Sequence, residues 1–117
     1  MIVEDLFGDE EGEPVRAVDL DAAWFRKLNK LLSKDGILVT NFVSSRQMRN
    51  CAYFTDERTK KHFKSAFQFV APHYENVIGA FLKKESNQRE LKNNLTETPL
   101  LNPTLKSCRL RYTVRRV

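Results

Sequence analysis

The first 42 residues constrain the fold more than any other part of the chain. Residues 2–4 predict the end of a buried strand, and residues 8–18 predict an acidic loop that contains glycine and proline. Apolar residues at helical spacing predict a helix over 19–33. An almost uninterrupted apolar run over 37–42 predicts a central strand that is buried on both faces. Strand, loop, helix and strand form one β-α-β unit, which indicates an α/β fold.

Local signals mark both ends of the predicted helix. Asp19 is a good N-cap, and Asp21 suits the positive end of the helix dipole. Gly36 can adopt the left-handed backbone conformation that ends a helix and turns the chain back towards the sheet. The helix is expected to bury the apolar residues that recur along one side, namely Leu20, Trp24, Leu28, Leu31 and Leu32.

The middle of the chain predicts a second helix and a third strand. Residues 44–55 are expected to form a connecting loop, and Thr55 is a plausible N-cap for the helix that follows. Pro72 lies just beyond the end of this helix, and the third strand covers 73–82. The apolar residues that the second helix is expected to bury are Phe63, Ala66, Phe67 and Val70.

The C-terminal part predicts a polar excursion and one more strand. The excursion covers 84–105 and includes a short helix at 88–95. Residues 107–117 alternate between apolar and basic side chains, which predicts a half-exposed strand antiparallel to the strand before it. Arginines on its exposed side would protect the edge of the sheet. The residues expected on its apolar side are Cys108, Leu110, Tyr112 and Val114.

Length and composition indicate a single domain over residues 1–117. No apolar run approaches the roughly 20 residues of a membrane span, and the N-terminus is acidic where a secretory signal would be basic. Because the chain has only two cysteines, we expect no disulfide framework and a cytoplasmic location. The cysteines and the two histidines lack the close pairing of zinc ligands, so no metal site is predicted.

Charge is distributed unevenly along the chain. Residues 1–21 carry eight carboxylates and one base, Arg16, whereas residues 22–117 carry nineteen bases and seven acids. A basic surface of this kind is usually a solvated surface, although it can also bind an acidic partner. Nucleic-acid binding is not expected, because Tyr112 is the one aromatic residue within the basic tail and falls on its apolar side.

Three polar residues are candidates for a functional site. Glu4 and Asp5 come at the end of the first strand, and Asn41 comes at the end of the second. Ligands of open α/β sheets bind in the crevice at such strand ends. Asp5 could act as a general base, with Glu4 and Asn41 as substrate-binding residues. Simple solvation of the two acids and backbone capping by the amide explain the same positions equally well.

Several segments resemble one known family. They are the strand end Glu4-Asp5, the helix 23–32, the Lys-Asp-Gly-Ile-Leu-Val-Thr-Asn phrase at 34–41, and the segments 67–70 and 75–81. On these segments the chain is similar to the C-terminal half of the spermidine synthase-like family, the polyamine aminopropyltransferases. This family shares the class I S-adenosylmethionine-dependent methyltransferase fold. The resemblance implies a partial Rossmann-like fold, with parallel strands and a C-terminal antiparallel pair.

The same resemblance implies an activity. Asp5 matches the catalytic aspartate, which helps to take a proton from the attacking amine of a polyamine, while decarboxylated S-adenosylmethionine is the donor. The chain has four glycines and no Gly-x-Gly grouping, so we expect it to bind no cofactor alone and to be inactive alone. A homodimer or a complementing chain is expected to cover the exposed sheet edge. The alternative is a non-catalytic interaction module whose basic face binds protein or RNA.

Overall fold

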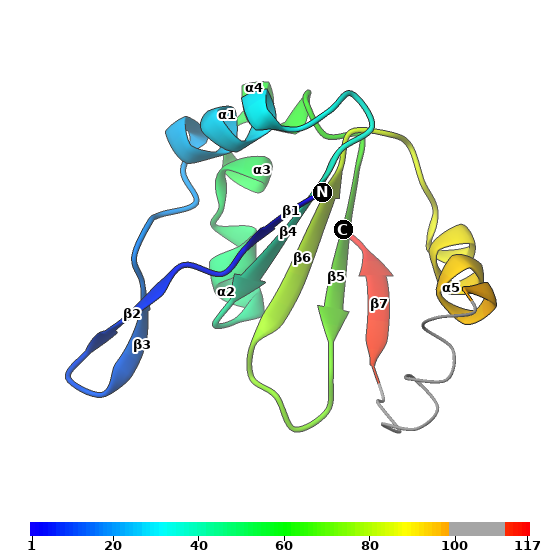
Figure 1. The fold of residues 1–117 in the computed structure, drawn as a ribbon. Helices are drawn as coiled ribbons and strands as arrows, with labels where there is room; N and C mark the ends of the chain where they lie inside the picture. Colours follow the sequence, from blue (N-terminus) through cyan, green and yellow to red (C-terminus); the bar gives the residue numbers. More distant parts are fainter. Residues whose placement is uncertain (99–111) are drawn as a thin grey trace.

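The computed structural model of the protein describes residues 1–98 and 112–117. A five-stranded sheet in the order β1-β4-β6-β5-β7 forms its centre (Figure 1). The mixed α/β class that the sequence predicts is therefore confirmed. In chain order the strands of this sheet are β1 (Ile2–Glu4), β4 (Ile37–Phe42), β5 (Ser65–Val70), β6 (Val77–Leu82) and β7 (Thr113–Arg116).

The sheet is mainly antiparallel. β1 and β4 are parallel, as the β-α-β prediction requires, and Val3 lies opposite Val39. β6 then runs antiparallel to both β4 and β5, so that β5 points in the same direction as the first two strands. β7 pairs antiparallel with β5 at the far edge. The expected pairing of the last strand with the segment 73–82 is wrong, because β5 lies between β6 and β7.

The expected acidic loop at 8–18 is wrong and is replaced by a two-stranded hairpin. Strands β2 (Phe7–Glu10) and β3 (Glu13–Arg16) pair antiparallel and project away from the main sheet (Figure 1). Glu11 and Gly12 connect them with φ angles of 55° and 86°. A two-residue turn with positive φ at both positions matches the twist of a hairpin, and glycine adopts this conformation without strain. The two strands contain few apolar residues, so a hydrophobic pattern does not predict this hairpin.

The first helix is shorter than its hydrophobic pattern predicts. α1 covers Ala22–Leu31, and its N-cap is Asp21 in place of the expected Asp19. The Asp21 carboxylate accepts a hydrogen bond from the backbone N–H of Trp24 at 2.8 Å. Leu31, expected in the core, is 76% exposed, and Phe25 occupies the centre of the buried side. The expected burial of Leu20, Leu28 and Leu32 is confirmed, and Trp24 is partly buried against the same core.

Gly36 is required for a different reason from the expected one. Its φ angle is not positive, so the predicted left-handed conformation is wrong. A Cβ atom added at Gly36 would lie 2.9 Å from two side-chain atoms of Leu32. The close approach of the helix end to the start of β4 therefore leaves room only for glycine. Burial along β4 also alternates, so the expectation of a strand buried on both faces is only half right.

The segment between β4 and β6 differs most from the prediction. Residues 44–55 hold two short helices where a loop is expected. The second predicted helix ends after one turn, and Ala66 and Phe67, expected on its buried side, lie fully buried in β5. A short apolar run fits a buried strand and a buried helix equally well. The short helices are α2 (Ser45–Arg49), α3 (Ala52–Thr55) and α4 (Glu57–Lys60).

The predicted short helix of the polar excursion is confirmed. α5 covers Gln88–Glu97 and begins with a capping box, in which Asn87 and Glu90 bind each other's backbone N–H groups. The third predicted strand begins at Val77, four residues later than expected. Val114 in β7 is buried, as expected. The predictions for 99–105 of the excursion and for Cys108 and Leu110 lie outside the described residues.

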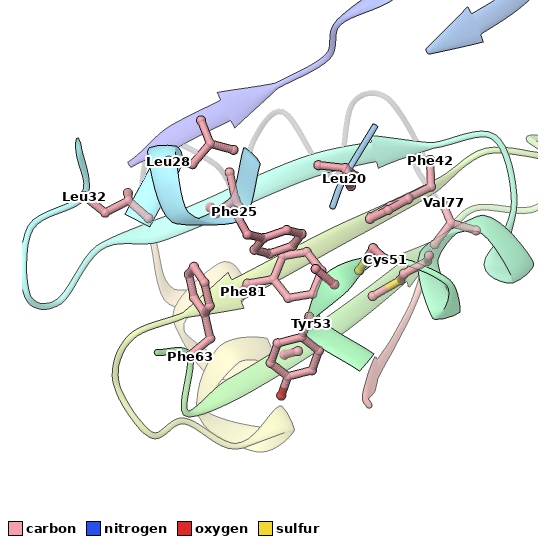
Figure 2. Packing of buried hydrophobic residues seen from close by; sticks show 14 residues of the cluster. Leu20, Phe25, Leu28, Leu32, Phe42, Cys51, Tyr53, Phe63, Val77 and Phe81 are labelled. Carbon is pink, nitrogen blue, oxygen red and sulfur yellow. The ribbon is translucent and has the colours of Figure 1, made fainter. Parts of the chain in front are cut away.

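The hydrophobic core lies on one face of the sheet, beneath α1 to α4. Figure 2 shows Phe81 of β6 at its centre, with the rings of neighbouring aromatic residues around it. Phe81 packs against Phe25 at a ring-centroid distance of 5.3 Å and against Tyr53 at 5.0 Å. Phe63 and Phe42 complete the cluster at 6.1 and 6.4 Å. The contacts of Phe81 with the three phenylalanines are edge-on, and such contacts add to the stabilisation from burial.

The opposite face is covered only in part. Leu91 of α5 packs there against Phe67 and Val114, above β5 and β7. Over β1, β4 and β6, none of the described helices lies on this face. The molecule is accordingly a plate with extents of 38 × 38 × 21 Å. A third layer is present only at the α5 end.

Candidate functional site

Two of the three predicted site residues meet at the carboxyl ends of β1 and β4. The Asn41 side-chain amide donates a hydrogen bond to the Asp5 carboxylate, with 3.0 Å between Nδ2 and Oδ1. Asn76, just before β6, donates in turn to Oδ1 of Asn41 at 3.1 Å. The Asp5 side chain remains exposed. The parallel pairing of β1 and β4 is what brings these two chain positions to one edge of the sheet.

Glu4 lies apart from this chain of polar groups. It is 3% exposed and lies opposite Thr40, on the face that the helices cover. Nη2 of Arg16 donates to both Glu4 carboxylate oxygens, at 2.6 and 2.5 Å. Successive residues of a strand point to opposite faces, so the Glu4 side chain lies on the other face of the sheet from the Asn41 side chain. A substrate-binding role for Glu4 stays a prediction, and its oxygens already have a partner.

Arg16 connects the elements of this region but is not among the predicted site residues. Its guanidinium also donates to the backbone carbonyl groups of Asn41 at 2.6 Å and Val18 at 3.2 Å. It lies 5.1 Å from the ring centroid of Phe7. These contacts hold the β2–β3 hairpin to the ends of β1 and β4. The signal was available, because Arg16 is the single base among the first 21 residues.

A polar pocket of about 310 Å³ opens beside Arg16. Asp19 and Asp21 line it, and neither forms an ion pair with any residue that the structure describes. Because Glu4 neutralises Arg16, the pocket carries a net negative charge. Such a charge favours a cationic or amine ligand. The other lining residues are Leu20, Phe42, Gln47, Asn50 and Cys51.

Cys51 lines this pocket but lacks the properties of a nucleophile. The thiol is buried, and burial raises its pKa to about 11. Because the thiolate is the reactive form, the side chain is inert near neutral pH. Asp56 shows the opposite behaviour, since hydrogen bonds from Thr59 lower the pKa of its carboxyl group. Asp56 is the N-cap of α4, so this shift reflects helix capping.

Other classes of site find no support in the residues that the structure describes. Over 1–98 and 112–117, no three histidine, cysteine, aspartate or glutamate side chains gather closely enough to hold a metal ion. Cys51 is a free thiol. Within the same ranges, none of the helices is long and apolar enough to cross a membrane.

Comparison with known proteins adds no further assignment. No family model matches the chain, and neither the curated proteins nor the solved structures contain a significant match. The resemblance to the spermidine synthase-like family therefore stays a prediction from the segments quoted above.

Proposed function

We propose that the chain is the amine-binding half of a spermidine synthase-like transferase and is inactive alone. The hydrogen bond from Asn41 to Asp5 carries the proposal, because it presents an exposed carboxylate at the carboxyl ends of two parallel strands. Ligands of α/β enzymes bind at such strand ends. The parallel pair β1 and β4 and the antiparallel strand β6 are consistent with the C-terminal half of a methyltransferase-like fold.

Asp5 has the geometry of a general base. Asn41 occupies one carboxylate oxygen, which leaves the second oxygen available to an amine. Asn76 fixes the orientation of the Asn41 amide, so that its nitrogen faces Asp5. When the amine nitrogen forms its new bond to carbon, it must lose a proton, and Asp5 is positioned to accept it. The negative pocket at Asp19 and Asp21 adds to the attraction of a cationic acceptor.

The residues of this chain do not fit the donor cofactor. A cofactor cradle needs glycines that leave space for a ligand, and none of the four glycines fulfils that role. Gly8 and Gly12 lie in the β2–β3 hairpin. Gly36 and Gly79 are packed against Leu32 and Phe42 of the same chain. We therefore assign only the amine side of the reaction to this chain, and a separate cofactor-binding half must supply the electrophile.

A complementation assay tests the proposal. The chain is joined to the cofactor-binding half of an aminopropyltransferase, and transfer from decarboxylated S-adenosylmethionine to putrescine is measured. We expect transfer that Asp5→Asn lowers by about 10²- to 10⁴-fold, the usual contribution of general-base catalysis. Asp9→Asn, which changes an exposed hairpin carboxylate, is the matched control and should retain activity. Activity that is equal in both variants would refute the role of Asp5.

One observation favours a second candidate, the non-catalytic protein-interaction module. The uncovered face of the sheet is apolar, and Val3 on this face is 64% exposed. Exposed apolar patches of this kind mark interaction sites. A binding module would need this face but not Asp5. The complementation assay separates the two functions, since a pure binding module never yields transfer.

A further inference from the structure

A second polar pocket lies between α1 and α4 and shares no lining residue with the pocket beside Arg16. It has a volume of about 300 Å³. Figure 1 shows α1 and α4 close together beside one end of the sheet. Phe25 of α1 and Phe63, which follows α4, line the pocket from the hydrophobic core. Their rings pack edge-on at a centroid distance of 5.8 Å, so this side of the pocket is apolar and firmly packed.

Three basic side chains line the same pocket. Arg26 of α1, Arg58 of α4 and His62 all contribute to it, and all three are exposed. Neither arginine forms an ion pair with any residue in the described ranges 1–98 and 112–117. A guanidinium group has five N–H donors, and without an acidic partner these donors are available to a ligand.

One acidic residue, Asp56, also lines the pocket, but it already has partners. Thr59 donates two hydrogen bonds to Oδ2 of Asp56, from its backbone N–H at 2.8 Å and from its hydroxyl group at 2.7 Å. These bonds cap the start of α4. Because one carboxylate faces two guanidinium groups, the pocket carries a net positive charge. Such a charge favours an anionic ligand.

The elements around the pocket extend this positive charge. α1 contains Arg26, Lys27 and Lys30 and no acidic residue. Residues 58–64 contain Arg58 and three lysines, again without an acid. Bases gathered in this way raise the local concentration of anions. Charge alone is typical of a solvated surface, whereas a cavity beside it can enclose a ligand.

The donors of the pocket match a phosphoryl group. A guanidinium group binds two oxygens of one phosphate through paired N–H donors. Two such groups and an imidazole supply more donors than the roughly four lone-pair sites of one carboxylate accept, whereas a phosphate monoester has three terminal oxygens. Asn29 also lines the pocket, and its Oδ1 is buried without a hydrogen-bond partner among the described residues. A hydroxyl group on the ligand would remove the cost of this unpaired oxygen.

We propose that this pocket binds the phosphoryl group of a small phosphate monoester that carries a hydroxyl group. Arg26 and Arg58 bind the phosphoryl oxygens from two helices, and His62 donates a further hydrogen bond. The ligand hydroxyl group donates to Asn29. The volume is at the lower end of the range for small-molecule sites, about 300–1,000 Å³, which favours a small molecule over a polymer. The inference does not depend on the transferase proposal, because Asp5 takes no part in it.

A calorimetric titration at low ionic strength tests this proposal. The probe is glycerol 1-phosphate, and sulfate is the comparison ligand because it has a similar shape and charge but no hydroxyl group. We expect glycerol 1-phosphate to bind with a dissociation constant of about 1 mM or below. Sulfate should bind at least about tenfold more weakly, since it cannot donate to Asn29. A dissociation constant above about 10 mM for glycerol 1-phosphate, or equal binding of sulfate, would overturn the proposal.

Variants of the chain locate the binding site. Arg26→Gln and Arg58→Gln change exposed side chains, so both variants should fold, and each should weaken binding of glycerol 1-phosphate about tenfold. Arg49→Gln is the matched control, because Arg49 is an exposed arginine on α2 that does not line the pocket. Its binding should equal that of the wild type. Equal weakening in all three variants would show that net charge alone attracts the ligand, and the proposal would be wrong.

Fluorescence anisotropy with a labelled single-stranded RNA of about 20 nucleotides tests the competing partner. RNA phosphates are diesters, which lack the three terminal oxygens of a monoester. We therefore expect Arg26→Gln and Arg49→Gln to weaken RNA binding to the same small extent, about twofold or less, through loss of one charge. RNA binding that Arg26→Gln and Arg58→Gln weaken at least about tenfold, and that Arg49→Gln leaves unchanged, would assign the pocket to nucleic acid and refute the proposal.

Discussion

The two faces of the central sheet differ in how their apolar residues are covered. On the face beneath α1 to α4, Phe81 and Phe42 are fully buried, and the rings of Phe25 and Tyr53 pack around Phe81 (Figure 2). On the other face α5 covers one end, where the strand residues are buried, whereas Val39 and Ile78 remain partly exposed. The buried residues of that end are Phe67, Ala80, Leu82 and Val114. The stability of the chain is therefore expected to depend mainly on the face beneath α1 to α4.

Removal of the central ring should have the largest effect on stability. Phe81→Ala removes a fully buried side chain that contacts four other aromatic rings. We expect the free energy of unfolding to fall by about 3–5 kcal/mol, which is typical of a buried phenylalanine. Urea denaturation measures the change. A loss below about 1 kcal/mol would contradict the assignment of the core to this face.

The second largest effect is expected at the ion pair beneath the site. Arg16→Met removes the guanidinium and leaves the buried Glu4 carboxylate without its partner. Loss of one partner of a buried pair costs about 3 kcal/mol or more, because the remaining charge is uncompensated. The double variant Glu4→Leu with Arg16→Met should recover most of this loss. Failure to recover would show that Arg16 acts through its backbone contacts and not through Glu4.

Adjacent residues of β6 offer a direct comparison of the two faces. A methyl group at Gly79 would lie 2.7 Å from the ring of Phe42, so Gly79→Ala should cost about 1–3 kcal/mol through overpacking. Ile78 is partly exposed on the other face, so Ile78→Val should change the free energy of unfolding by less than about 0.5 kcal/mol. Equal costs at the two positions, measured by urea denaturation, would mean that both faces are tightly packed.

A pH dependence distinguishes the buried thiol from a surface group. Burial raises the pKa of Cys51 from 9.0 to about 11 in the folded chain. Its contribution to stability is present below pH 9 and is lost as the pH rises from 9 through 11, because only the unfolded chain ionises there. The slope is at most about 1.4 kcal/mol per pH unit. In the wild type the urea midpoint should be lower at pH 10 than at pH 8, and this difference should become smaller in Cys51→Ala. A difference of the same size in Cys51→Ala would show that another group causes the pH dependence.

The smallest effect is expected on the uncovered face. Val3→Thr replaces a side chain that is 64% exposed on this face. The free energy of unfolding should change by less than about 0.5 kcal/mol, because little apolar surface is lost from burial. The thermal midpoint should stay within a few degrees of the wild type. A loss above about 1.5 kcal/mol would show that another part of the chain covers Val3.

Sequence reasoning succeeded where one physical signal was strong. The β-α-β order places Asp5 and Asn41 at one edge of the sheet, and the structure joins them by a hydrogen bond. It failed where a helix and a buried strand fit the same pattern of apolar residues. The apolar run at 65–70 satisfies helical spacing as well as a buried strand, and only its pairing with β6 and β7 decides for the strand.

Charge misled the prediction in the N-terminal part. Residues 7–16 contain too few apolar residues to predict strands, and the Glu11-Gly12 turn was the remaining signal for a hairpin. Glu4 and Asp5 looked equivalent because they are adjacent. Successive side chains of a strand point to opposite faces, so Glu4 binds Arg16 on one face and Asp5 binds Asn41 on the other. The hairpin brings Arg16 back to Glu4, so the contact between them could not be predicted without the hairpin.

Methyl NMR with a soluble paramagnetic gadolinium chelate tests the difference between the faces most directly. Two pairs of adjacent residues serve as internal controls, Leu38 with Val39 and Val77 with Ile78. Leu38 and Val77 are buried, whereas Val39 and Ile78 are partly exposed. We predict strong broadening of the Val39 and Ile78 methyl signals and little broadening of their neighbours. Equal protection of all four residues would show that both faces are covered, and the account would be wrong.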